Sequence, residues 1–328
     1  MRYRTLGRLD WQVSEIGYGM WGIAGGPGGF TGGADYDTAP GCLDLAVELG
    51  CNFFDTAWAY GRGISEQMLG ALLRRHPDRK LYVATKIPPK DMEWPPRADA
   101  SLDEVFPAAH IRQYVHKSLE NLAADRIDLV QFHVWEDRWA KDERWQEAVS
   151  DLKREGVIDA VGISVNRWEP ANCLAAIDTG LVDVIQVIYN IFDQAPEDEL
   201  FARTQADGIG VIARVPFDEG TLAGAVRADS TWPEGDWRNT YFGPENLGPS
   251  VEHLERLVAD VGDEMPLPEL ALRFILANPA VSTVIPGMRT QGHVRANLAA
   301  SEAGPPDGAL LDRLRQHRWD RVPAWWSG

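Results

Sequence analysis

Eight short runs rich in β-branched and aromatic residues recur along the 328-residue chain, and amphipathic stretches separate them. This alternation is typical of βα repeats that build a parallel sheet, and the nearly apolar runs suit strands covered on both faces. The expected strands are Glu15–Trp21, Cys51–Ala57, Leu81–Ile87, Asp128–Trp135, Val157–Val165, Val182–Asn190, Gly208–Pro216 and Val281–Gly287. Helix patterns between them include Pro40–Gly50, Ser65–Arg75, Ile111–Leu122 and Trp145–Glu155.

The number of repeats distinguishes a closed barrel from an open sheet. An open sheet that binds a dinucleotide usually carries GxGxxG after its first strand. The first run here ends in GYGMWG, which lacks that spacing. Because no composition break marks a linker, we expect one α/β domain over residues 1–328, a (β/α)8 TIM barrel.

Three segments lie outside the repeats. The stretch YRTLGRLDWQVS predicts a β-hairpin that plugs the barrel floor. The region from Asp218 to Ser250 is rich in Gly, Pro and Trp and poorly periodic, and a long loop of this kind is usually functional. Residues Gly308–Val322 predict a C-terminal helix.

Composition excludes several classes of partner. The net charge of −17 disfavours binding to nucleic acids and to anionic membranes, which attract clustered Lys and Arg. No apolar run is long enough to cross a bilayer, and the N-terminus is too polar for a signal peptide. The three cysteines lack metal-binding or paired spacing. We therefore expect a cytoplasmic protein without a metal, either a monomer or a homo-oligomer.

Ionisable residues stand at the ends of three consecutive expected strands. Asp55 ends the second, Lys86 the third and His133 the fourth, while Tyr60 follows in the loop after the second. In a barrel, function sits at the C-terminal ends of the strands. We therefore expect these four side chains to converge at the barrel mouth.

Such a cluster suits proton transfer. A tyrosine titrates near pH 10, and a neighbouring ammonium such as that of Lys86 is expected to lower the pKa of Tyr60. Asp55 would keep Lys86 charged, and His133 could hydrogen-bond a carbonyl oxygen, so that Tyr60 could act as the proton donor. An Asp–Lys pair that merely closes a barrel layer and a histidine buried in the core are also consistent with these residues.

The motifs GYGMWG, NFFDTAWAYGRGISEQMLG, VATK, QFH, GIS, IQVIYN, VPFDEGTLAG and VIPGMRTQGHVRANLAA resemble, in this order, the aldo-keto reductase family. The resemblance runs from Arg2 to about Ala300. It implies that Asp55, Tyr60, Lys86 and His133 are the catalytic residues. It also implies that NADPH (or NADP+) binds in extended form across the barrel mouth.

The resemblance further assigns the ends of the cofactor. Ser164, Asn166 and Gln186 would hold the nicotinamide amide, although Val165 separates the serine from the asparagine, which departs from the family pattern. Arg214 stands where many relatives stack an aromatic ring on the nicotinamide, and its cation would disfavour the oxidised ring. The remaining predicted cofactor contacts are Gly19, Met20, Trp21 and Asp55, then Val215, Pro216, Phe217, Gly220 and Leu222 at the pyrophosphate, and Gly287, Arg289, His293 and Asn297 at the adenosine.

Trp21, Trp58 and Trp135 are expected to wall the substrate pocket, which suits a hydrophobic carbonyl compound or a sugar ring. The predicted activity is NADPH-dependent reduction of an aldehyde, ketone or sugar. Two alternatives are an NADPH-binding regulatory subunit with slow turnover and a sugar-modifying lyase or epimerase. A Schiff-base aldolase is disfavoured, because Asp55 should keep Lys86 protonated.

Overall fold

The computed structural model describes residues 1–24, 38–262 and 265–327. Its main sheet has eight strands in the order β10-β9-β8-β7-β6-β5-β4-β3, and every pair of neighbours is parallel. The strands are β3 (Tyr18–Gly19), β4 (Phe53–Asp55), β5 (Tyr82–Ile87), β6 (Ile127–Phe132), β7 (Ile158–Ser164), β8 (Val184–Ile188), β9 (Gly210–Arg214) and β10 (Thr283–Val284). Parallel bridges from Ile16 to Val284 and from Gly19 to Gly287 join the two ends of the sheet. The predicted barrel is confirmed.

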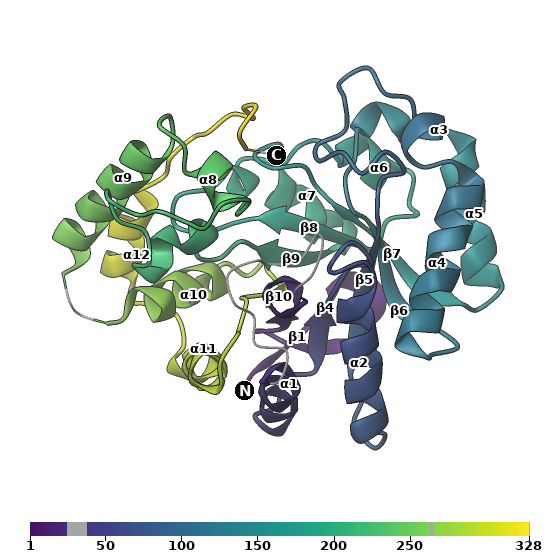
Figure 1. Ribbon diagram of the computed structural model, residues 1–328, viewed down its shortest axis with the longest axis horizontal. Helices are drawn as coiled ribbons and strands as arrows, with labels where there is room; N and C mark the ends of the chain where they lie inside the picture. Colours follow the sequence, from purple (N-terminus) through teal and green to yellow (C-terminus); the bar gives the residue numbers. More distant parts are fainter. Residues whose placement is uncertain (25–37, 263–264, 328) are drawn as a thin grey trace.

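Helices follow the strands on the outside of the sheet (Figure 1). The four helix patterns predicted from the sequence correspond to α1 (Ala39–Glu48), α2 (Ile64–Arg75), α4 (Ala108–Leu122) and α5 (Glu143–Arg154). The remaining helices are α3 (Leu102–Val105), α6 (Leu174–Asp178), α7 (Leu200–Asp207), α8 (Arg238–Tyr241), α9 (Leu247–Val261), α10 (Leu267–Ala277), α11 (Gln291–Ala303) and α12 (Gly308–Arg315).

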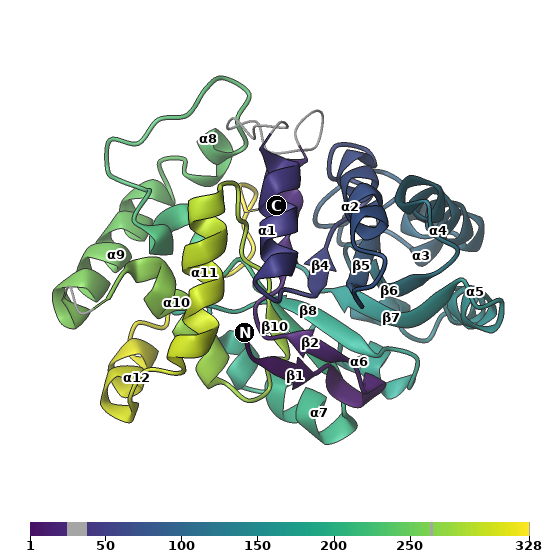
Figure 2. The same ribbon diagram turned by 90° about the horizontal axis from the view of Figure 1, so that it is seen from below.

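The N-terminal hairpin closes the floor of the barrel, as predicted. It consists of β1 (Tyr3–Thr5) and β2 (Gln12–Ser14), joined around the short helix η1 (Gly7–Leu9) (Figure 2). Leu6 is fully buried in one apolar cluster with side chains from the lower ends of the barrel strands. Gly7 has a φ of +54°, and a Cβ there would lie 2.3 Å from the backbone nitrogen of Gly210. The hairpin therefore packs backbone against backbone at this point, which requires glycine.

The C-terminal helix is shorter than predicted. It ends at Arg315 rather than at Val322. Beyond it, Trp319 stacks on the His253 ring at 4.1 Å, and Arg321 forms a buried ion pair with Asp218 at 2.7 Å. These contacts require an extended tail, and Pro323 disfavours helical geometry at the residue before it.

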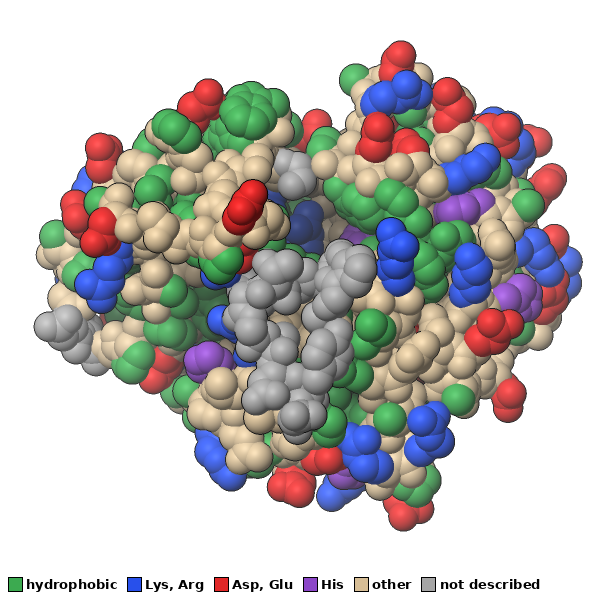
Figure 3. Space-filling model, in the orientation of Figure 1, with side chains coloured by type: hydrophobic (Ala, Val, Ile, Leu, Met, Phe, Trp, Pro, Cys, Tyr) green, Lys and Arg blue, Asp and Glu red, His purple; other side chains and the backbone are tan. Residues whose placement is uncertain are grey.

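Acidic and basic side chains are interspersed over the face of the molecule in Figure 3, with no continuous basic patch. All three cysteines are free and buried. Among the described helices, none combines the length and the apolar character needed to cross a membrane. The described residues also include no cluster of His, Cys, Asp and Glu suited to hold a metal ion.

Candidate active site

The four ionisable residues at the strand ends meet at the barrel mouth. Asp55 is the last residue of β4, Lys86 lies near the end of β5, and His133 directly follows β6, the third of three neighbouring strands. The Lys86 Nζ lies 2.5 Å from Asp55 Oδ2 and 3.4 Å from the hydroxyl oxygen of Tyr60. It also donates to the Thr56 carbonyl oxygen at 2.8 Å. The fold thus places an ammonium between a carboxylate and a phenol.

The His133 ring completes this cluster. Its centroid lies 5.7 Å from that of Tyr60, with the two rings at 74° to each other. The ring centroid of Trp94 also lies close to that of His133, at 5.5 Å. The His133 Nδ1 is buried and has no hydrogen-bond partner within the described part of the chain. One face of the cluster therefore presents both a hydroxyl and an imidazole toward the same space.

Burial and the neighbouring charges together determine the protonation states of Tyr60, Lys86 and His133. Burial raises the pKa of Tyr60, and the opposing effect of Lys86 does not overcome it. The expectation that Lys86 would lower this pKa is therefore wrong in net direction. Burial alone would lower the pKa of Lys86, but Asp55 and Tyr60 raise it above its usual value. Burial and the charges of Lys86 and Arg214 hold the pKa of His133 well below its usual range. At neutral pH the site has a charged lysine, a neutral imidazole and a protonated phenol.

Two glutamines hold the second oxygen of Asp55. Gln186 Nε2 donates to Asp55 Oδ1 at 2.7 Å, and Gln131 Nε2 donates to the same atom at 3.2 Å. Gln186 was predicted from the family resemblance as a cofactor contact, whereas Gln131 was not predicted. The available signal was a polar residue near the C-terminal end of a largely apolar strand, two residues before His133. Asp55 is thus fixed from β5, β6 and β8 at once.

A cavity of about 680 Å³ opens above the cluster. Tyr60 and His133 line it, and so do Trp21 and Trp58, as expected. Lining residues that the sequence did not single out include Arg62, Met92, Trp94 and Arg167. These come from loops, whose course only the folded chain defines.

Trp135 does not line the cavity, so its prediction as a pocket wall is wrong. Its side chain is 0% exposed and packs against Phe132 and Trp145, each with ring centroids 5.3 Å away. Asn166 holds the Trp135 backbone, accepting from its nitrogen at 3.2 Å and donating to its oxygen at 2.8 Å. After His133 the chain therefore turns away from the mouth and buries the indole.

The residues predicted for the nicotinamide end lie around the same mouth. Ser164 and Gln186 are opposite each other in the register of β7 and β8. Asn166 lines the cavity, but its amide nitrogen already donates to Trp135 and to two glutamates. Arg214 ends β9 and also lines the cavity. Its Nη2 donates to the Val165 oxygen at 2.9 Å, while its buried Nε has no partner in the described residues.

The backbone after β9 makes a tight turn of mixed handedness. Val215 has a φ of +55° and Gly220 a φ of +112°. Leu222 is fully buried and anchors the short helix η5 (Asp218–Ala223). The predicted pyrophosphate residues of this segment are Val215, Pro216, Phe217, Gly220 and Leu222.

The loops after β3 and β10 lie side by side. Gly19 bridges to Gly287, and a Cβ on Gly22 would lie 3.4 Å from the Arg289 side chain. Thr290 caps α11 by accepting from the His293 nitrogen at 3.1 Å. Burial and the neighbouring charge of Arg238 lower the pKa of Arg289, and Arg238 is itself paired with Asp236 at 2.7 Å. The set predicted here (Gly19, Met20, Trp21, Gly287, Arg289, His293 and Asn297) thus lies on two adjoining loops and on α11.

Comparison with known proteins finds a similarity to one enzyme family over nearly the whole chain. The model of the Aldo/keto reductase family matches residues 15–317. The chain belongs to the aldo/keto reductase family. It is therefore an oxidoreductase of a family that acts on carbonyl compounds with a nicotinamide cofactor.

Relatives of this aldo/keto reductase include both uncharacterised and named enzymes. It is 32% identical over 322 residues to the uncharacterized oxidoreductase YqkF of Bacillus subtilis, covering 97% of this chain and 96% of the relative. It is 30% identical over 317 residues to the NADH-specific methylglyoxal reductase of Escherichia coli, covering 92% and 93%. The holo form of aldo-keto reductase AKR11C1 from Bacillus halodurans matches with a TM-score of 0.76, 29% identity and 100% of both chains.

Proposed function

We propose that this aldo/keto reductase reduces the carbonyl group of an aldehyde, ketone or sugar to an alcohol with NADPH, and that Tyr60 donates the proton. The observation that carries the proposal is the convergence of Tyr60, Lys86, Asp55 and His133 below one cavity. A phenol that stays protonated at neutral pH is suited to donate rather than to accept a proton.

The proposed chemistry assigns one task to each side chain. Bound NADPH supplies the hydride. The Tyr60 hydroxyl and a nitrogen of His133 hydrogen-bond the substrate oxygen, which orients the carbonyl and stabilises the negative charge that develops on it. Tyr60 then gives its proton to that oxygen, and the nearby Lys86 ammonium stabilises the phenolate left behind. Asp55 keeps Lys86 charged and in place.

The residues around the mouth fit an extended dinucleotide. Arg214 has a buried Nε without a hydrogen bond in the described part of the structure, so a ligand there would satisfy a donor. Ser164, Gln186 and Asn166 would hold the nicotinamide end, the turn after β9 the pyrophosphate, and Asn297 with His293 the adenosine.

Arg289 supports NADPH rather than NADH, because a guanidinium can bind the 2′-phosphate that only NADPH carries. Since one relative is named as NADH-specific, this preference needs its own test. We expect kcat/KM to be at least about tenfold higher with NADPH, and Arg289→Gln to remove most of that difference. A wild-type preference for NADH would contradict the cofactor assignment but not the reductase activity.

The activity itself is tested by mixing the purified chain with each reduced cofactor and a panel of aldehydes, ketones and sugars. Loss of nicotinamide absorbance with stoichiometric formation of the alcohol is the expected result. If no compound in the panel consumes either cofactor, the proposed function is wrong.

A further inference from the structure

The cavity carries positive charge in a strongly acidic protein. Among the described residues that line it, three are arginines (Arg62, Arg167 and Arg214) and none is Asp or Glu. The whole chain, by contrast, carries 49 acidic residues against 32 Lys and Arg. The cavity lining therefore runs against the overall charge of the molecule, which suggests that it receives an anion.

The three arginines differ in whether another residue already neutralises their positive charge. Arg167 is paired with Glu219 at 2.6 Å, so its charge is largely neutralised. Arg214 is half-buried and ends β9, among the residues proposed to hold the nicotinamide. Arg62 is exposed, and no described residue hydrogen-bonds or forms an ion pair with its side chain. Its guanidinium is therefore available to a ligand.

The position of Arg62 points to the substrate rather than to the cofactor. It lies two residues after Tyr60, in the loop after β4, and shares the cavity wall with Trp58 and Trp94. Most of the proposed cofactor residues, by contrast, follow β7, β8, β9 and β10. An anion bound by Arg62 would therefore belong to the molecule whose carbonyl faces Tyr60.

The backbone at Arg62 is held in an unfavourable conformation. Gly61, Arg62 and Gly63 have φ values of +65°, +53° and +96° in succession. Positive φ is free of strain for the two glycines, whereas it is unfavourable for an arginine. A glycine would fit this turn better, so the arginine at this position lowers stability.

We propose that Arg62 selects carbonyl substrates that carry a carboxylate or a phosphate, with an apolar body between the anionic group and the carbonyl. The planar guanidinium can bind either anion through two parallel hydrogen bonds, while Trp58 and Trp94 flank the apolar body. This inference rests on the proposed reductase function and specifies its substrate class.

The test compares aldehydes that differ only in charge. We would measure kcat/KM for para-formylbenzoate against para-formylbenzamide, and for para-formylphenyl phosphate against its neutral dimethyl ester. The wild-type chain is expected to prefer the anionic member of at least one pair by about tenfold or more. The pair with the larger ratio identifies the anion as a carboxylate or a phosphate.

Substitutions then assign the preference to one side chain. Arg62→Gln should remove most of the preference, Arg62→Glu should reverse it, and Arg62→Lys should retain part of it. Arg62→Gly should also remove it while leaving thermal stability unchanged or higher, because glycine accepts the local φ. The matched control is Arg74→Gln, which removes the same charge from an exposed site in the last turn of α2 and should leave the ratio unchanged.

Equal kcat/KM values for charged and neutral aldehydes in the wild-type chain would overturn this inference and leave the reductase function intact. The same conclusion follows if Arg74→Gln lowers the preference as much as Arg62→Gln does. Failure to reduce any aldehyde at all would instead contradict the proposed function.

Discussion

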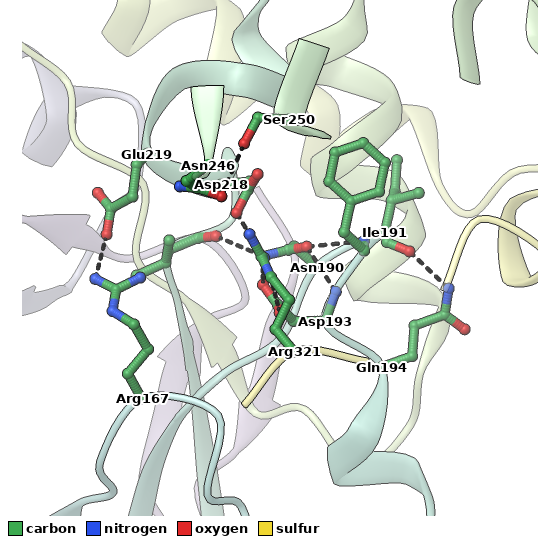
Figure 4. A network of polar contacts seen from close by, with 12 residues as sticks. Arg167, Asn190, Ile191, Asp193, Gln194, Asp218, Glu219, Asn246, Ser250 and Arg321 are labelled. Atoms are coloured by element: carbon green, nitrogen blue, oxygen red, sulfur yellow. Dashed lines mark hydrogen bonds and ion pairs between the residues drawn. The ribbon is translucent and has the colours of Figure 1, made fainter. Parts of the chain in front are cut away.

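Two buried ion clusters lie at the mouth of this barrel, and they have different roles. In the first, Lys86 meets Asp55, with side chains 1% and 2% exposed. In the second, Arg321 from the C-terminal tail lies between Asp193 and Asp218, and all three side chains are at most 6% exposed (Figure 4). Both clusters are thus almost fully buried, although Lys86 faces one carboxylate and Arg321 faces two.

The clusters differ in what surrounds the cation. Each cation has a phenol nearby, Tyr60 at 3.4 Å from Lys86 and Tyr241 at 3.5 Å from Arg321, but of the two phenols Tyr60 alone lines the large cavity. The Arg321 guanidinium packs against the faces of Trp168 and Trp319, at 4.7 and 4.5 Å from the ring centroids. Burial alone would lower the pKa of Arg321, but the charges of Asp218 and Asp193 raise it above its usual value. Arg321 thus holds the tail to the loops after β8 and β9. A buried ion pair indicates an active site only when a group that exchanges protons connects it to a cavity.

The largest effect is expected from removing the phenol. Tyr60→Phe should lower kcat/KM by about 10²- to 10⁴-fold, because the proton donor is lost while the fold is kept. Steady-state kinetics measure this loss, and fluorescence titration should give an unchanged Kd for NADPH.

The same substitution in the second cluster is the control. The Tyr241 hydroxyl lies 3.5 Å from Arg321 and outside the cavity lining, so Tyr241→Phe should change kcat/KM by less than about threefold. If Tyr60→Phe keeps its rate, or if both variants lose it equally, the distinction between the clusters fails.

The next effect is on stability. Arg321→Gln should lower the free energy of unfolding by about 3–5 kcal/mol, because it leaves two buried carboxylates without their cation. Arg318→Gln removes the same charge from a pair with Asp198, whose side chains are 31% and 59% exposed, and should cost less than about 1 kcal/mol. Chemical denaturation measures both, and equal losses would show that Arg321 does not anchor the tail.

A smaller change is expected at Arg214, the cation beside the proposed nicotinamide site. Arg214→Tyr should bring the affinities for NADP+ and NADPH closer by about tenfold, because the guanidinium disfavours the positively charged oxidised ring. Titration with each form gives the ratio. An unchanged ratio would mean that Arg214 does not face the nicotinamide.

The smallest effect is the response to pH. The pKa of His133 lies well below its usual value, whereas those of Tyr60 and Lys86 lie above theirs. None of the three therefore changes charge between about pH 7 and pH 9, and kcat should vary by less than about twofold there. Above about pH 10 the rate should fall as the Tyr60 phenol loses its proton. A midpoint near neutrality would contradict these protonation states.

The strand-end residues could be predicted because their signal is local. Asp55, Lys86 and His133 each end an apolar run, and parallel strands bring such ends together. The same logic fails two residues later at Trp135, because the chain has left the strand and no longer alternates between its two faces. Burial also reversed the expected shift at Tyr60, and burial depends on the packing of the whole barrel.

The contacts of the tail left no such signal. Arg321 pairs with Asp193, 128 positions earlier in the chain, and neither residue stands in a recognisable motif. Arg62 lies within the motif that carries Tyr60, but its place in the cavity wall depends on where the loops after β5 and β7 come to lie. Long-range pairings of this kind follow from the fold and not from the pattern along the sequence.

The contacts that close the barrel also determine when it can close during synthesis. The bridges from Ile16 to Val284 and from Gly19 to Gly287 join segments from opposite ends of the chain. During synthesis, the free edges of β3 and β9 must therefore wait until β10 has left the ribosome, and contacts of such sequence separation form slowly. Until then the growing chain exposes strand edges that could pair with other chains, and the arrival of β10 removes these edges.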